Sequence, residues 1–203
     1  EDDRNRVELY RARERVTTGM SAAGDVDAFL AGLNMELLIE RVTDATMQRP
    51  LQLINKTNQF NINGMREDAS SWGAFFENDF EVYQLMLQDD IANHGVVAVL
   101  VVGVEDTQLR VYHFVLSCRV FSRRIEHSIL AWLNSIALQR SCATVAFRCR
   151  ETAKNLPVRR FLAASVQNFE EGLSREEARW FVVDNVINLE GFASIAASSA
   201  NGN

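Results

Sequence analysis

Residues 109–138, LRVYHFVLSCRVFSRRIEHSILAWLNSIAL, form the stretch that decides the fold. The first part is apolar and alternating, which predicts a strand that runs to Val120. The last part repeats apolar residues at helical spacing, which predicts an amphipathic helix over 124–138 with Ser122 as its cap. A strand that leads into a helix N-terminus favours an anion site, because unpaired N–H groups and the helix dipole both point there. We therefore expect the binding site at this junction.

The segments around the junction predict a mixed fold. An antiparallel meander is expected from strands at 81–87, 96–104 and 109–120, and a helix, a strand at 142–147, a helix and a strand at 180–183 follow. Before the meander, we expect a strand at 35–42, a helix capped by Asp25, a helix that begins at Pro50, and a helix at 70–76. This order predicts an α+β domain with a GNAT-like mixed, largely antiparallel central sheet flanked by helices.

Three parts of the chain are distinguished by composition. Residues 1–18 are highly charged and predict a surface helix that links to a missing upstream domain, since the chain begins with Glu1. Residues 19–193 are expected to form the GNAT-like domain. Residues 194–203 are small and polar, which predicts a mobile C-terminal tail.

Size and cysteine content exclude several classes of protein. With 203 residues, 47% of them hydrophobic, the chain can bury one full core. We expect no membrane association, because no apolar run approaches the roughly 20 residues that span a bilayer and no signal peptide opens the chain. Cys118, Cys142 and Cys149 are odd in number and lack metal-ligand spacing, so neither disulfides nor a metal site is indicated. A cytoplasmic location fits this pattern.

Positive charge is concentrated in one segment. Residues 119–160 hold nine basic and two acidic residues, a net charge of +7. Because the whole chain has a net charge of −6, the remaining residues carry −13. Binding to nucleic acid is not expected, because it needs an extended positive face. A local anion pocket that includes Arg119, Arg123 and Arg124 is one interpretation of the basic segment, and a solvated rim of arginines is the other.

Cys118 is the candidate nucleophile of the junction. A thiolate can hold an acyl group in transit between two thioesters, and an adjacent arginine or helix N-terminus favours the thiolate. His94 and His127 are the candidate bases. In the alternative interpretation Cys118 continues the alternation of Phe114 and Leu116 and is a buried core thiol.

Amide side chains form a second candidate feature. Asn58, Gln59 and Asn61 lie in a dense polar run that can bind a hydroxylated or amide-containing ligand. Their alternative use is to cap helix ends and bind their own backbone.

Three fragments occur in a fixed order along the chain: TNQFN at 57–61, LSCRV at 116–120 followed by Glu126, and TAKN at 152–155 followed by Pro157. Together they resemble the C-terminal region of FkbH-like proteins, which belong to the HAD superfamily and act in polyketide pathways. The resemblance extends over the flanking segments.

The resemblance implies an acyltransferase. Such proteins are similar to enzymes that take a glyceryl unit from 1,3-bisphosphoglycerate, remove phosphate, and load the unit on an acyl carrier protein as a thioester. It implies an acyl carrier protein and an upstream HAD phosphatase domain as partners, and magnesium only in that missing domain. The carrier's phosphopantetheine is the expected cofactor, and coenzyme A is the alternative. Lys154 and Asn155 are candidate contacts to the pantetheine or to phosphate, although Asn155 can equally cap a helix.

Glycine is missing where a GNAT enzyme needs it. GNAT enzymes hold the coenzyme A pyrophosphate on N–H groups of a glycine-rich turn between strand and helix, whereas no glycine occurs here from Val104 to Glu171. Arginine side chains can bind phosphate instead. The leading hypothesis is therefore glyceryl transfer to a carrier protein. The alternative is a degenerate, non-catalytic GNAT fold that docks the carrier or braces the HAD domain, and transfer from free coenzyme A ranks last.

Overall fold

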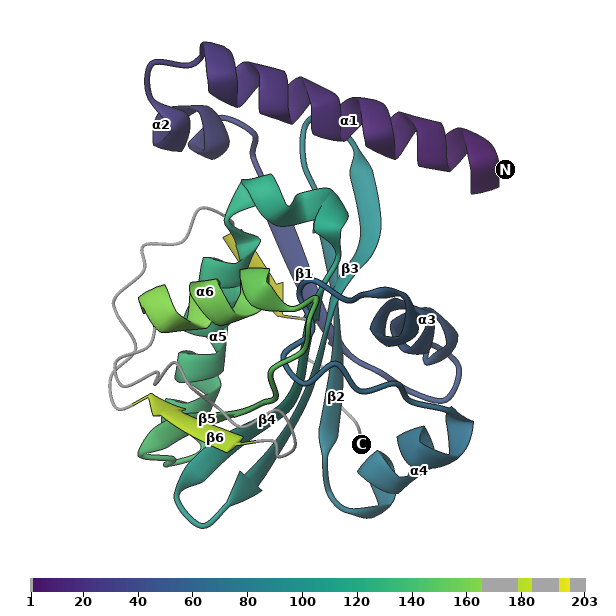
Figure 1. Cartoon of the computed structure of the whole chain (residues 1–203), viewed down its shortest axis with the longest axis vertical. Coiled ribbons are helices and arrows are strands. Elements are labelled where there is room, and N and C mark those ends of the chain that lie inside the picture. Colours follow the sequence, from purple (N-terminus) through teal and green to yellow (C-terminus); the bar gives the residue numbers. More distant parts are fainter. Residues whose placement is uncertain (1, 166–178, 184–193, 198–203) are drawn as a thin grey trace.

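The computed structural model describes residues 2–165, 179–183 and 194–197, and these residues build a sheet with the strand order β6-β5-β4-β3-β2-β1-β7 (Figure 1). The strands are β1 (Glu36–Arg41), β2 (Glu81–Gln88), β3 (Asn93–Glu105), β4 (Gln108–Leu116), β5 (Thr144–Cys149), β6 (Arg179–Val183) and β7 (Ser194–Ala197). The helices are α1 (Asp2–Ala22), α2 (Val26–Ala31), α3 (Gln48–Lys56), α4 (Ala69–Glu77), α5 (Ile125–Gln139) and α6 (Leu156–Ser165), with a 3-10 helix, η1 (Cys118–Arg123), before α5.

The sheet is mixed and largely antiparallel, as the sequence predicts. Strands β1 to β4 form an antiparallel meander, and β6 is antiparallel to β5. The parallel pairs are β4 with β5 and β1 with β7. The β4–β5 pair is parallel because helix α5 returns the chain to the end of the sheet at which β4 begins, and β5 starts from there.

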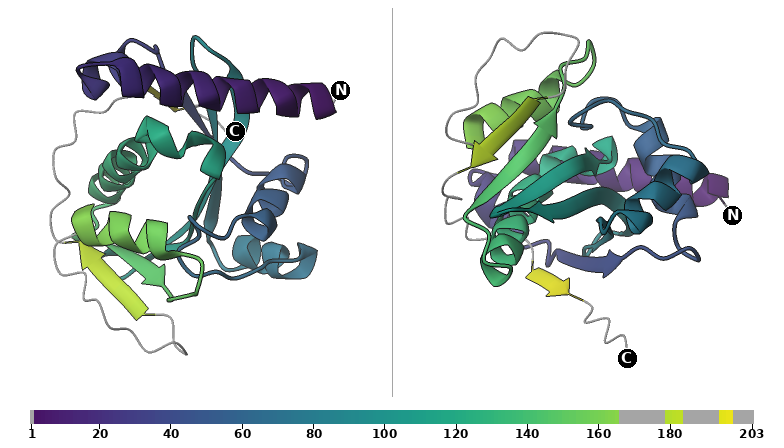
Figure 2. Two further views of the ribbon diagram at one scale, coloured as in Figure 1. Left: turned by 45° about the horizontal axis from the view of Figure 1, so that its top comes forward. Right: turned by 90° about the horizontal axis from the view of Figure 1, so that it is seen from below.

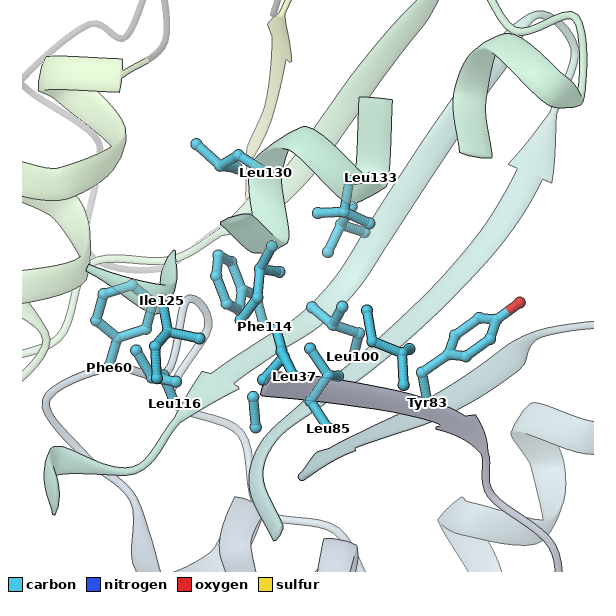
Figure 3. Close-up of a cluster of buried hydrophobic side chains, with 14 of the residues drawn as sticks. Leu37, Phe60, Tyr83, Leu85, Leu100, Phe114, Leu116, Ile125, Leu130 and Leu133 are labelled. Atoms are coloured by element: carbon cyan, nitrogen blue, oxygen red, sulfur yellow. The ribbon is translucent and has the colours of Figure 1, made fainter. Parts of the chain in front are cut away.

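Helices cover both faces of the sheet, with α5 and α6 on one face and α3 and α4 on the other (Figure 1). The central strand β3 is therefore apolar at successive positions. Leu100 belongs to the core under α5, which Figure 3 shows, while Val99 and Val101 pack with Trp72 of α4 on the opposite face. A strand covered on both faces needs apolar side chains in both directions.

Helix α1 lies across one end of the sheet (Figure 2). It reaches Ala22, so the boundary expected at residue 18 falls inside it, and it contacts η1. Ala12 and Val16 are fully buried, and Val16 is part of the core beneath α5. The first helix is thus packed against the domain. None of the helices in the described residues is long and apolar enough to cross a membrane.

Several local predictions need correction. The strand expected to reach Val120 ends at Leu116, because the chain turns there into η1. Arg124, not Ser122, directly precedes α5; it makes no side-chain cap and has a φ of +54°. Ser194–Ala197, expected in a tail, pairs with β1, whereas residues 198–203 of that tail lie outside the described part. Asp25 caps α2 as predicted, accepting hydrogen bonds from two backbone N–H groups.

Strands β4 and β5 separate after a short paired stretch, and we call the space between them the notch. The pairing covers Gln108–Val111 with Thr144–Phe147. Beyond it, residues 60–63 fill the notch. Ile62 N donates to Phe114 O at 3.3 Å, and Leu116 N donates to Phe60 O at 3.0 Å. On the other side Arg150 N donates to Ile62 O at 2.9 Å, so the segment bridges both strands.

Candidate active site

A cavity of about 1450 Å³ opens where η1 meets the start of β3. Its walls come from α1, α3 and the loop after it, β3, η1, and the loop before α6. Of the residues that the structure describes, five basic ones and no carboxylate line it: Arg13, Arg49, Lys56, Arg119 and Lys154. Such a site attracts anions, because no acidic residue among those described in its walls balances these cations.

Two of these cations repel each other. Burial lowers the pKa of the Arg119 guanidinium, and the charge of Arg49 lowers it further. Arg119 is held by hydrogen bonds from Nε to Ser117 Oγ at 3.1 Å and from Nη2 to Val96 O at 3.4 Å. An anion bound between the two guanidinium groups would relieve their repulsion, and guanidinium groups bind phosphate and carboxylate bidentately.

Cys118 is exposed and lines this cavity. The buried-core interpretation of Cys118 is therefore wrong. Its premise was the alternation of β4, but the strand ends at Leu116 and Cys118 is the first residue of η1. Cys142 and Cys149 are buried, and burial raises the pKa of the Cys149 thiol to about 12. Among the cysteines, Cys118 alone combines solvent access with a cationic setting.

His94 lines the cavity from the start of β3. Its Nε2 lies 3.0 Å from Asp89 Oδ2, and the same oxygen accepts a hydrogen bond from Arg123 Nε at 2.9 Å. Asp89 Oδ1 accepts from Ile91 N and Ala92 N. Burial opposes ionisation of Asp89, but the hydrogen bonds from His94, Ala92 and Arg123 outweigh it and hold the Asp89 pKa well below its ordinary value.

Six predicted site residues meet in the cavity: Asn58, Gln59, His94, Cys118, Arg119 and Lys154. The other two arginines are engaged elsewhere. Arg123 has no exposed side-chain surface and is paired with Asp89 inside the fold. Arg124 forms an ion pair with Asp27, in the first turn of α2.

The two remaining asparagines hold the notch segment. Asn61 is fully buried, and its Oδ1 accepts from Gly64 N at 2.9 Å. Asn155 is also fully buried; its Nδ2 donates to Arg150 O at 2.8 Å and to Asn61 O at 3.1 Å, while its Oδ1 accepts from Thr152 N at 2.9 Å. Both amides therefore bind backbone groups, which is the alternative use predicted for Asn61. The Asn155 side chain accepts from Thr152 N in the preceding loop and does not cap α6.

His127 is not among the residues that line the cavity. Its ring packs against Phe161 with centroids 5.1 Å apart, and burial lowers its pKa. The neighbouring Glu126 lies in the first turn of α5, where burial raises its pKa to about 7. His127 thus packs against α6, and its Nδ1 lies 3.7 Å from Glu126 Oε1, away from the cavity lining.

Sequence reasoning missed the basic residues contributed by the helices. Arg49 and Lys56 are seven residues apart in α3, two helical turns, so both lie on one face together with Gln52. That spacing was an available signal. Arg13 carried no such signal, because only the packing of α1 over η1 brings it to the cavity.

The fold is that of the GNAT acetyltransferases. No protein-family model matches the chain, and no curated protein matches it. Among solved structures, the ribosomal-protein-S18-alanine N-acetyltransferase of Escherichia coli aligns with a TM-score of 0.53 at 11% identity, over 76% of this chain and 97% of that one. A GNAT-family acetyltransferase of Staphylococcus aureus gives 0.51 at 7% identity, over 73% and 98%. The PaiA N-acetyltransferase of Thermoplasma acidophilum in complex with coenzyme A gives 0.50 at 4% identity, over 73% and 99%.

The turn between β4 and α5 does not fit the diphosphate of coenzyme A. It is wound into η1 and ends in Arg124, so the glycine-lined approach to backbone N–H groups is missing. The Glu126 carboxyl group occupies the first turn of α5, where an anion would otherwise bind. In the notch, Phe60 and Ile62 already take the backbone groups of β4 with which an extended ligand would pair. The basic side chains of the described site lie instead around the cavity.

Proposed function

We propose that the chain is the acyltransferase module of an FkbH-like protein and transfers a glyceryl group to the phosphopantetheine thiol of an acyl carrier protein. The observation that carries the proposal is the exposed thiol of Cys118 in a cavity whose lining, within the described part of the chain, has five basic residues and no acidic one. The resemblance at 57–61, 116–120 and 152–155 supplies the substrate class, the carrier protein and the upstream HAD phosphatase domain as partners.

In this mechanism Cys118 holds the acyl group in transit. Its thiolate attacks the donor carbonyl carbon, a C–S bond forms, and the donor's leaving group departs with the electron pair. The carrier's thiolate then attacks the new thioester, and Cys118 leaves as a thiolate. Arg49, Lys56 and Arg119 hold the phosphate of the donor or of the phosphopantetheine arm by charge-assisted hydrogen bonds.

Intact-mass analysis tests the proposal directly. The chain is incubated with glyceryl-loaded carrier protein, and transfer to the protein is measured for wild type, Cys118→Ala and the matched control Cys149→Ala, which removes a buried thiol. Wild type and Cys149→Ala should gain one glyceryl group, and Cys118→Ala none. Glyceryl-coenzyme A, which contains the same phosphopantetheine thioester, serves as the comparison donor and should load Cys118 more slowly. Absence of an adduct on the wild-type protein refutes the role of Cys118.

A second candidate is a non-catalytic module that docks the carrier protein. The filled notch and the glycine-free turn favour it, because both remove ligand-binding backbone groups from the fold. The same experiment separates the two candidates. Carrier binding that persists without any adduct on Cys118 supports docking.

A further inference from the structure

Helix α3 fixes the distance between two of the basic residues that line the cavity. Arg49 lies in the first turn of α3, and Lys56 is its last residue. At about 1.5 Å per residue, their Cα atoms are separated by about 10 Å along the helix axis. The cavity therefore has an Arg49 end and a Lys56 end.

The Arg49 end is completed by Arg119 of η1. Burial lowers the pKa of Arg119, and the charge of Arg49 lowers it further, so the two guanidinium groups are close enough to act on each other. Arg119 is half-buried and is held by hydrogen bonds to Ser117 Oγ and Val96 O. These contacts keep a pair of cations at this end of the cavity.

The Lys56 end is completed by Lys154. Thr57 directly follows Lys56, and its carbonyl oxygen accepts a hydrogen bond from Asn61 Nδ2 at 3.5 Å. Asn61 O in turn accepts from Asn155 Nδ2 at 3.1 Å, and Lys154 precedes Asn155 in the chain. This series of contacts joins the segments that carry the two lysines, and both lysines line the cavity.

The surface of α3 between the two ends is uncharged. Gln52 lies on the same face of the helix, three residues after Arg49 and four before Lys56. Its Oε1 accepts from Arg49 Nη1 at 3.4 Å, and Leu53 adds apolar surface beside it. The cavity of about 1450 Å³ is also larger than the roughly 300–1,000 Å³ of most small-molecule pockets. These features suit an elongated ligand with an uncharged middle.

We propose that the cavity binds an elongated ligand with two phosphate-like anionic groups about 10 Å apart, one at Arg49 and Arg119 and the other at Lys56 and Lys154. Two cations at each end match one phosphate group, whose charge at pH 7 is about −1.5 to −2. A three-carbon bisphosphate is too short to bridge the ends, because at about 1.2 Å per bond its phosphorus atoms lie at most about 7 Å apart. The inference concerns the number and spacing of the anionic groups, and it holds whether or not Cys118 carries an acyl group.

Calorimetric titration of the wild-type chain with three synthetic ligands tests the spacing. The phosphorus atoms of hexane-1,6-diol bisphosphate reach about 11 Å apart, those of propane-1,3-diol bisphosphate about 7 Å, and hexyl phosphate has one phosphate only. The long bisphosphate should bind at least about tenfold more tightly than hexyl phosphate, because it makes charge-assisted contacts at both ends. The short bisphosphate has the same charge but should gain no more than about threefold, since its second phosphate meets only screened attraction. Equal affinity of the two bisphosphates, or no advantage over hexyl phosphate, overturns the proposal.

Substitutions at each end test the assignment of the residues. Arg49→Gln and Lys56→Gln should each reduce the advantage of the long bisphosphate over hexyl phosphate by at least about threefold, because each weakens one of the two contacts. Arg160→Gln removes an exposed charge outside the cavity lining and should leave this advantage unchanged. An advantage that is the same in Lys56→Gln as in wild type refutes the Lys56 end.

Moving one cation along α3 provides a control at constant net charge. The double variant Gln52→Lys/Lys56→Gln places the cation three residues from Arg49, about 4.5 Å along the helix axis. The preference should then shift towards the short bisphosphate, and an unchanged preference for the long one contradicts the proposal. The wild-type titrations decide the question even if this variant fails to fold.

The outcomes distinguish this inference from the proposed function. If Cys118 never carries a glyceryl group but the long bisphosphate is preferred, acyl transfer fails and the two-ended site stands. If the adduct forms but the two bisphosphates bind alike, the two-ended site is refuted and the proposed function stands.

Discussion

Replacing Asn155 with alanine should destabilise the fold without touching the cavity. The side chain makes four hydrogen bonds: from Nδ2 to Arg150 O, to Asn61 O and, at 3.4 Å, to Ile62 O, and from Thr152 N to Oδ1. Asn155 is fully buried, so the backbone partners released by the substitution lose their bonds inside the protein. At a net value of about 1 kcal/mol for each of the three shorter bonds, the free energy of unfolding should fall by about 3 kcal/mol.

Asn155→Asp sharpens this prediction because it keeps the shape and reverses the hydrogen-bonding role. The aspartate still accepts from Thr152 N but places a carboxylate against three carbonyl oxygens, those of Asn61, Ile62 and Arg150. At pH 7 it should therefore be less stable than Asn155→Ala. The folded state raises the pKa of such a carboxyl group, so the penalty is present above its unfolded pKa of about 4 and disappears at lower pH, where the protonated group donates again.

Urea denaturation followed by circular dichroism measures both variants at pH 7 and pH 4. With a slope of about 2 kcal/mol/M, Asn155→Ala should lower the midpoint by about 1.5 M. A loss below about 1 kcal/mol for Asn155→Ala, or an aspartate variant as stable as the alanine variant at pH 7, would refute the structural role of Asn155. Such a result would favour a role of Asn155 in ligand binding.

Three further predictions concern α5, the turn before it and the cavity. Burial raises the pKa of Glu126 to about 7, so this carboxyl group binds its proton more tightly in the folded state than in the unfolded state. The free energy of unfolding should therefore fall as the pH rises from about 4.5 to 7. In thermal melts, Glu126→Gln should remove this pH dependence and should be up to about 3 kcal/mol more stable than wild type at pH 8. Arg124→Gly should be about 1 kcal/mol more stable than Arg124→Ala, because both lose the same exposed ion pair but only glycine suits a φ of +54°; equal unfolding midpoints would contradict this. Arg49→Gln and Lys56→Gln should each weaken binding of inorganic pyrophosphate roughly fivefold in calorimetry, whereas the exposed Arg160→Gln, outside the cavity, should not.

The fold was accessible from the sequence because its periodicity is strong. The meander follows from alternation and turn residues between 81 and 116, and α5 follows from its apolar spacing. The end of β4 was not accessible, because Ser117–Val120 continues an apolar pattern while Ser117 Oγ caps η1 through Arg119 N. With η1 in place of a continued strand, Cys118 is exposed and does not continue the buried alternation of Phe114 and Leu116.

The site was only partly accessible for a different reason. The sequence predicted the site residues that lie near Cys118 along the chain. Charge alone did not distinguish the arginines that line the cavity from those that are paired inside the fold. Arg119 and Arg123 look alike in the sequence, yet Arg123 is paired with Asp89, which is 34 residues away. Arg13 required the packing of α1 over η1, which single-sequence patterns do not encode.

The notch segment also bears on how the protein avoids self-association. Where β4 and β5 diverge, each strand would present unpaired N–H and C=O groups, and such edges are templates for pairing with another chain. Residues 60–63 cover both edges, and Asn155 fixes them there from 94 residues away in the sequence. Releasing residues 60–63 from the notch would therefore expose two strand edges at once. We expect intermolecular β-pairing and precipitation to follow, in addition to lower stability.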